Sequence, residues 1–157
     1  MRLFKSSRDK KITESIKFVI PQVQRIINDS LRIINSTKNI DTGISRWGLI
    51  KKILEQLLEQ VPKGETEKFF KNFVINGQTI KTKEDLNIIS QEKNKWIRDF
   101  LFEEIKKEEN KADALSSSKL KKKQLNKALD KALSALEYLP DNPDIKKKTS
   151  FLESKVK

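Results

Sequence analysis

Four lysines at four-residue intervals are the residues of this chain whose spacing best suits a chemical role. Lys119, Lys123, Lys127 and Lys131 fall within a segment of helical pattern. Each four-residue step turns a helix by about 40°, so the row covers about 120° of arc, opposite the apolar side. The row predicts an exposed basic face that could bind an anionic partner. The alternative is a solvated surface without a partner.

The residue types that most enzymes use are missing. The chain has no cysteine and no histidine. This excludes a Ser–His–Asp arrangement on this chain, a thiolate nucleophile and cysteine-ligated zinc or iron–sulfur sites. The four glycines are never spaced as in a phosphate-binding loop. We therefore expect no enzyme, no cofactor, and no catalytic, cofactor-binding or metal-binding residues.

The glutamates do not form a predicted metal site either. Glu55, Glu59, Glu103 and Glu104 lie on the polar faces of predicted helices. A metal site in a helical bundle needs glutamates that project inward, together with histidines. We expect solvated charges instead, with Lys107 pairing with Glu103 or Glu104 one helical turn away.

The net charge of +12 has two interpretations. It could provide an electrostatic surface for a nucleic acid. However, lysine outnumbers arginine by 28 to 6, and arginine is better suited to bidentate phosphate and base contacts. Ile, Lys and Asn make up 56 of the 157 residues, a bias that an A/T-rich coding sequence would also produce. The excess charge lies at the ends: residues 110–157 carry twelve basic and six acidic residues.

The clearest helix is predicted over Ile44–Val61, where apolar residues recur every three or four positions. We expect this stripe, including Trp47, to form the core. A first helix over Ile12–Asn35 has the same spacing and contains Pro21, which either kinks it or divides it in two. The unbroken apolar phase favours a kink. Asp41 or Thr42 could cap the second helix.

The middle of the chain combines helical and turn signals. A short helix is predicted over 65–74, with Phe69, Phe70 and Phe73 on its apolar side. Asn76-Gly77 between apolar residues predicts a β-hairpin, or a tight turn with a few extended residues, since isolated hairpins are marginal. Thr82 and Asp85 then resemble a capping box for a helix that runs to about Glu109 and includes Trp96 on its apolar stripe.

In the last third, aromatic residues almost vanish while alanine and lysine become frequent. A helix is predicted over Lys119–Leu139. Asn142 and Pro143 are expected as the N-cap and first residue of a final short helix. The side predicted to be apolar in the longer helix comprises Leu125, Ala128, Leu129, Ala132, Leu133, Leu136 and Leu139.

This last segment resembles one tetratricopeptide repeat. The second-helix pattern of that family falls on Ala128, Ala132, Ala135 and Pro140, and its first helix would hold Leu115 and Ser116. The aromatic residues of the family are replaced by Ala112, Lys119 and Ala132. The resemblance implies a helical hairpin, against the alternative of an ordinary amphipathic helix pair. A single repeat is too short to bury a solenoid core.

A second resemblance covers Asp29–Leu58. The run from Ser36 to Thr42, followed by Ser45-Arg46, looks like a helix–loop–helix module of uncharacterised bacterial and prophage proteins. Gly43 and Trp47-Gly48 depart from it, where bulkier residues and a tyrosine are expected. The resemblance implies a helical bundle and no particular activity.

Together these features predict an all-α protein, a bundle of five to six helices with a small β-hairpin near Asn76-Gly77. We expect a bundle over 1–109 and a basic helical hairpin over 110–157. No run approaches eighteen apolar residues, so we expect no membrane span and a cytoplasmic location. The expected function is a non-catalytic protein–protein interaction or adaptor module. The alternative is a basic accessory protein that binds nucleic acid.

Overall fold

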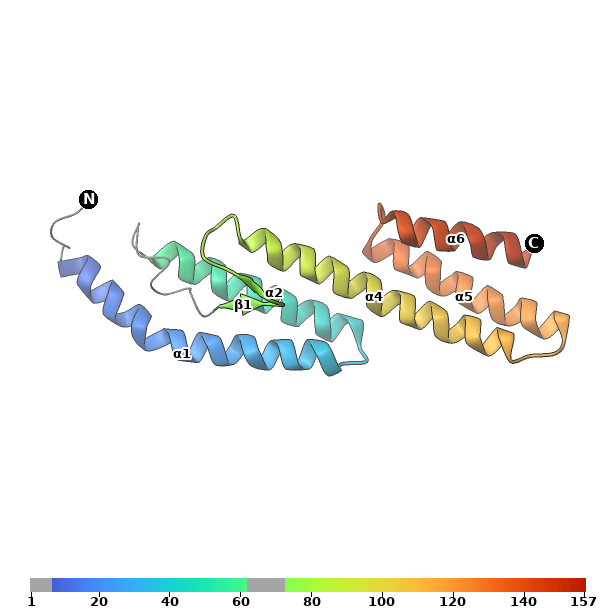
Figure 1. The fold of residues 1–157 in the computed structure, drawn as a ribbon, viewed down its shortest axis with the longest axis horizontal. Helices are drawn as coiled ribbons and strands as arrows, with labels where there is room; N and C mark the ends of the chain where they lie inside the picture. Colours follow the sequence, from blue (N-terminus) through green and yellow to red (C-terminus); the bar gives the residue numbers. More distant parts are fainter. Residues whose placement is uncertain (1–6, 62–72) are drawn as a thin grey trace. The chain divides into compact units, whose positions relative to one another are not determined.

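The computed structural model describes residues 7–61 and 73–157. Helices account for 81% of these residues, and the only other regular structure among them is a two-stranded antiparallel sheet, which confirms the all-α class and the hairpin. The elements are α1 (Ser7–Ser36), α2 (Ile40–Gln60), β1 (Val74–Ile75), β2 (Gln78–Thr79), α4 (Leu86–Asp113), α5 (Ser118–Tyr138) and α6 (Pro143–Val156) (Figure 1).

The chain forms two compact units, Met1–Lys93 and Asn94–Lys157. The division falls inside α4, earlier than the boundary expected after residue 109. The reason is a hydrophobic cluster in the second unit, where Ile105 of α4 packs with residues of α5 and α6. The C-terminal half of α4 therefore belongs to the same core as α5 and α6. Along the described residues, we find no helix with the length and apolarity to cross a membrane.

In the first unit, α1 and α2 pack lengthwise as a helical hairpin. Their buried residues are spaced by combinations of three and four, the spacing of two helices that share a long seam. These residues are Ile16, Val23, Ile27, Ser30 and Ile34 of α1, and Gly43, Trp47, Ile50, Leu54 and Leu57 of α2.

The second helix begins four residues earlier than predicted, because its N-cap is Asn39 and neither Asp41 nor Thr42. Asn39 has an extended backbone, and its side-chain oxygen accepts a hydrogen bond from Thr42 N at 3.1 Å. This satisfies a first-turn N–H that has no partner within the helix.

The first helix is continuous through Pro21. The α1 ribbon changes direction in its N-terminal half (Figure 1). The proline ring opposes the carbonyl four residues before it, and the missing N–H removes one bond of the helical ladder. The structure thus shows the kink that the unbroken apolar phase favoured, and not a division into two helices.

The predicted hairpin is present. Val74 pairs with Thr79 and Ile75 with Gln78. Asn76 and Gly77 both have positive φ, 49° and 83°, as a two-residue type I′ turn requires. Of the short helix predicted just before it, residues 65–72 with Phe69 and Phe70 lie outside the described residues.

The hairpin is attached to α4 within the first unit. One carboxylate, that of Glu92, accepts a hydrogen bond from Asn76 Nδ2 at 2.7 Å and one from Gln78 Nε2 at 3.1 Å. The side chains of Ile75 and Ile80 are fully buried. These contacts explain why a two-stranded hairpin, marginal by itself, persists here.

In the second unit, α5 and α6 form a hairpin around small residues. The fully buried residues of α5 are Ala128, Ala132 and Ala135. Leu133, which the sequence placed on the buried side, is 45% exposed. Alanines allow the backbones of two helices to approach closely, whereas the larger leucines flank the contact.

The N-cap of α6 is formed by residues next to it in the sequence. The Asn142 side chain accepts hydrogen bonds from the N–H groups of Asp144 and Ile145, and Pro143 occupies the first turn, as predicted. Leu115 and Ser116 lie in the connection between α4 and α5. In the tetratricopeptide resemblance, these two positions belong inside a helix.

Candidate functional site

All four lysines of the predicted basic face are exposed on α5. The helix starts after Ser117, whose side chain accepts a hydrogen bond from Leu120 N. Because Ala128 and Ala132 turn toward the core, residues on the opposite side face solvent. The helical period alone was sufficient to predict this exposure.

The four lysines differ in their partners. Lys131 Nζ lies 3.6 Å from Glu104 Oε2 of α4. Lys119, Lys123 and Lys127 take part in no ion pair with any residue that the structure describes. The row therefore consists of three free lysines and one that is paired.

The beginning of α5 is strongly basic. Lys119, Lys121 and Lys122 lie near its start, and its first turn contains no acidic residue. A helix N-terminus carries partial positive charge, so cations there are unfavourable. Successive lysines at i and i+4 also repel one another. The positive charge of Lys119 is thus unfavourable to the start of the helix, and Lys123 and Lys127 add repulsion along the row.

Three glutamates of α4 form ion pairs or hydrogen bonds within the second unit. Lys107 Nζ lies 3.6 Å from Glu104 Oε1, one of the two surface pairings expected. Glu108 accepts a hydrogen bond from Gln124 of α5. Glu109 pairs with Lys148 of α6 at 3.1 Å. In the described part of the chain, no three acidic residues are grouped in a way that could hold a metal ion.

The two tryptophans differ in burial. Trp47 is 2% exposed and belongs to the core, as expected. Trp96 is partly exposed, and its ring centroid lies 5.2 Å from that of Phe100 at a tilt of 42°. Neighbouring Arg98 reaches Asp144 at the start of α6, 3.7 Å away.

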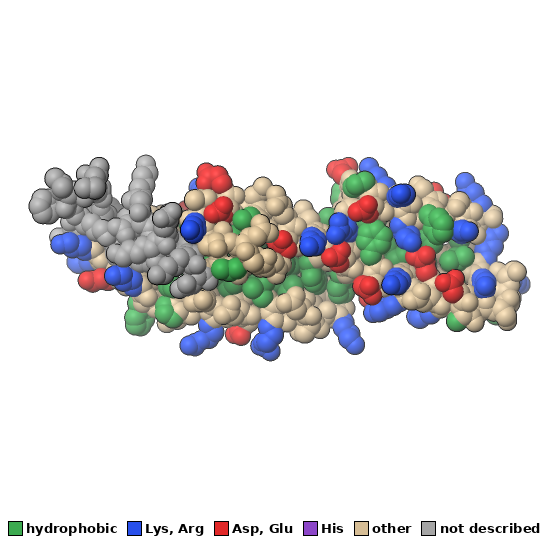
Figure 2. Space-filling model, in the orientation of Figure 1, with side chains coloured by type: hydrophobic (Ala, Val, Ile, Leu, Met, Phe, Trp, Pro, Cys, Tyr) green, Lys and Arg blue, Asp and Glu red, His purple; other side chains and the backbone are tan. Residues whose placement is uncertain are grey.

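Basic side chains are distributed over the part of the molecule that holds α5 and α6, interspersed with acidic ones (Figure 2). No acidic residue lies between Asp113 and Asp130 in the sequence. The N-terminal half of α5 is therefore uniformly basic, and only its C-terminal half carries both signs.

A second surface, on α1, was missed by sequence reasoning. Phe18 is 76% exposed, Val19 37% and Ile26 39%. Hydrophobic side chains are visible at the surface along this helix (Figure 2). Val19 and Ile26 belong to the apolar stripe expected to be buried. Their exposure could have been predicted from the width of the apolar stripe on α1, because the stripe is wider than the surface that α2 alone can cover.

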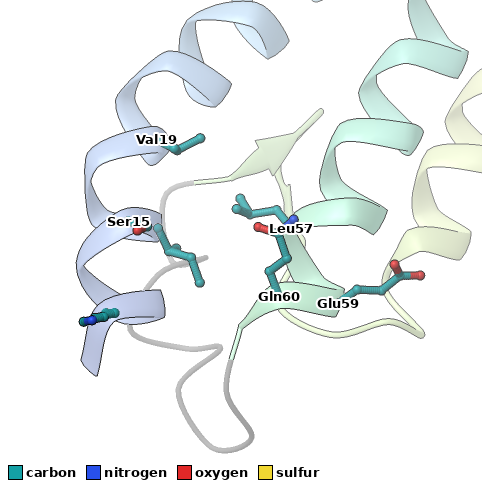
Figure 3. Close-up of a pocket in the computed structure, with 7 residues that line it drawn as sticks. Ser15, Val19, Leu57, Glu59 and Gln60 are labelled. Atoms are coloured by element: carbon teal, nitrogen blue, oxygen red, sulfur yellow. The ribbon is translucent and has the colours of Figure 1, made fainter. Parts of the chain in front are cut away.

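Beside this surface lies a groove of about 450 Å³ between α1 and α2 (Figure 3). Ser15 and Val19 line it from α1, and Leu57 and Gln60 from α2. In Figure 3 these side chains point into the space between the helices, while Glu59 points away from α1. Its lining is both apolar and polar.

Comparison of the chain with protein-family models, with curated proteins and with solved structures gave no match. The two resemblances noted in the sequence therefore stay predictions. The two surfaces described here, on α1 and on α5, are the observations from which a function can be argued.

Proposed function

We propose that the protein is a non-catalytic helical interaction module that binds an amphipathic helix of a partner protein along α1. The observation that carries this proposal is a second apolar row beside the core. Val19, Ile26 and Ile33 are spaced by seven residues, so they share one side of the helix, and each is partly or largely exposed. A helix that follows the same seven-residue spacing could pack along this row.

The groove supports this mode of binding. A partner helix in a groove is held by apolar anchors at intervals of three, four and seven residues. The space between Val19 and Leu57 could take one such anchor. Phe18 offers the most exposed aromatic side chain on α1. Arg25, which is exposed on the same side of the row as Phe18, would favour a partner helix with an acidic residue beside its apolar face.

The test compares partners of the tagged full-length chain with those of the double variant Val19→Ser/Ile26→Ser. One defined protein should crosslink to the wild type and be lost with the variant. It should be retained by Asn28→Ser, a matched control at an exposed polar position on the opposite side of the same helix. Circular dichroism melts of all three establish that they fold. If the same protein binds the wild type and the double variant equally, the row on α1 is not the contact surface.

A further inference from the structure

We propose that Lys119, Lys123 and Lys127 of α5 bind the phosphate backbone of a double-stranded nucleic acid, without reading its sequence. This surface lies on α5 of the second unit, and the proposal is independent of partner binding along α1. Of the four lysines of the row, the proposal keeps the three that form no ion pair with a described residue.

The geometry of the row fits a regular line of negative charge. At a rise of about 1.5 Å per residue, successive lysines are about 6 Å apart along the axis, and the three span about 12 Å. Phosphates of one duplex strand follow each other at about 3.4 Å along its axis, so each of the three lysines has a phosphate within reach. Long, flexible lysine side chains can adjust to this spacing.

Electrostatics provide a second argument. Lys119 lies in the first turn of α5, where the helix dipole opposes a positive charge, and repulsion between neighbouring lysines opposes all three. Lys131, which lies further along, pairs with Glu104, whereas the three lysines before it pair with no acidic residue in the described part of the chain. A polyanion would relieve the repulsion at this end of the helix.

The neighbours of the lysines argue against other anionic partners. A helix that lies on a membrane needs large apolar residues beside its basic ones. Here Asn126 and Ser134 share the lysine side, and the exposed apolar residues of α5, Leu120, Leu133 and Tyr138, are widely separated along the helix and form no continuous apolar row beside the lysines. A tight protein interface usually has an aromatic or arginine anchor at its centre, and this face has neither.

The test uses the full-length chain and a fluorescein-labelled 20-base-pair DNA duplex of arbitrary sequence. Anisotropy titrations between 50 and 200 mM salt should give a slope of log K against log salt of about −3, since each neutralised phosphate contributes about −0.9. A second duplex of different sequence should bind with the same affinity within about twofold.

The decisive variant is Lys119→Gln/Lys123→Gln/Lys127→Gln. Its affinity at 50 mM salt should fall at least about tenfold and its slope should approach zero. The control Lys17→Gln/Lys38→Gln/Lys52→Gln removes the same charge from exposed positions outside α5 and should stay within about threefold of wild type. Lys131→Gln should change affinity less than about twofold, because that lysine is already paired.

Folding and binding can be separated. The triple variant should melt at or above the wild-type temperature, because it removes repulsion. Should it fail to fold, the single change Lys123→Gln is the test and should reduce the slope by about one. Three results would overturn the proposal: no duplex binding at 50 mM salt, an equal loss in the control, or lysine-dependent binding to phosphatidylserine vesicles or polyglutamate without duplex binding.

Discussion

At the scale of single residues, Asp85 shows how one carboxylate establishes where a helix begins. Its Oδ2 accepts hydrogen bonds from Lys81 N at 2.9 Å and Thr82 N at 3.0 Å, while Thr82 Oγ1 accepts one from Asp85 N. This is the reciprocal pattern of the predicted capping box, with aspartate in place of glutamate. The bond from Lys81 N–H, followed by those from Thr82, lowers the pKa of Asp85 below its ordinary 3.8.

We expect Asp85→Ala to lower the free energy of unfolding by about 1 kcal/mol at pH 7, the usual cost of a lost cap. Because the pKa of Asp85 is lower in the folded chain than in the unfolded chain, the unfolded state binds more protons at acid pH. The contribution is therefore complete above the ordinary pKa and is lost as pH falls through the folded value.

Urea unfolding of wild type and Asp85→Ala at pH 7 and at successively lower pH checks this expectation. The difference between them should shrink in acid. Glu84→Gln, which removes a neighbouring exposed carboxylate from the same turn without removing the cap, is the control. A difference that stays constant with pH would show that the charge of Asp85 contributes nothing.

At the scale of elements, the seam between α1 and α2 pairs residues of unequal size. Only residues 37–39 connect the helices, so we expect the buried positions to pair in order from this connection, Ile34 with Gly43 and Ser30 with Trp47. A small residue would then face a large one at both levels. Ser30 Oγ and Trp47 Nε1 are buried and have no hydrogen-bond partner among the described residues.

This arrangement predicts that Ser30→Ala stabilises the first unit, by about 1 kcal/mol, because it removes a buried hydroxyl that makes no hydrogen bond. Ser30→Leu should destabilise it by about 1–3 kcal/mol, because there is no room for a larger side chain opposite Trp47. Chemical unfolding of both variants measures the two effects. A loss of stability in Ser30→Ala would mean that the hydroxyl has a partner in solution, such as a bridging water.

At the scale of the whole molecule, α4 contributes to two cores. Leu86 and Ile89 are buried in the first unit, and Ile97, Leu101 and Ile105 in the second. The second unit therefore needs the C-terminal half of α4 as well as α5 and α6. A break after residue 109 would remove Ile105 from the cluster with Ala128, Ala132 and Leu152.

We therefore expect a fragment of residues 94–157 to be helical and to melt cooperatively, and a fragment of residues 110–157 to melt without cooperativity. The shorter fragment lacks the apolar side chains that α4 places against α5. Circular dichroism during heating compares the two. Equal cooperativity in both fragments would instead support the boundary expected from the sequence alone.

The sequence by itself determined the features that depend on neighbours in the chain. The capping residues Asp85 and Asn142 act within a few positions of themselves, and the turn at Asn76-Gly77 depends on two residues that tolerate positive φ. The exposure of the lysine row followed from the helical period. All of these could be predicted, because the groups that stabilise them lie within one or two turns.

Only the tertiary structure decided which apolar residues are covered and which charges are paired. Val19 and Ile26 have the spacing of core residues, but burial depends on what packs opposite them, and α2 covers only part of the stripe. Lys131 differs from Lys127 because Glu104, distant in the sequence, lies beside it. Ala128 and Ala132 of α5 are buried because Ile105 of α4 and Leu152 of α6 pack with them. Such outcomes depend on contacts between segments far apart in the chain, which helical periodicity does not encode.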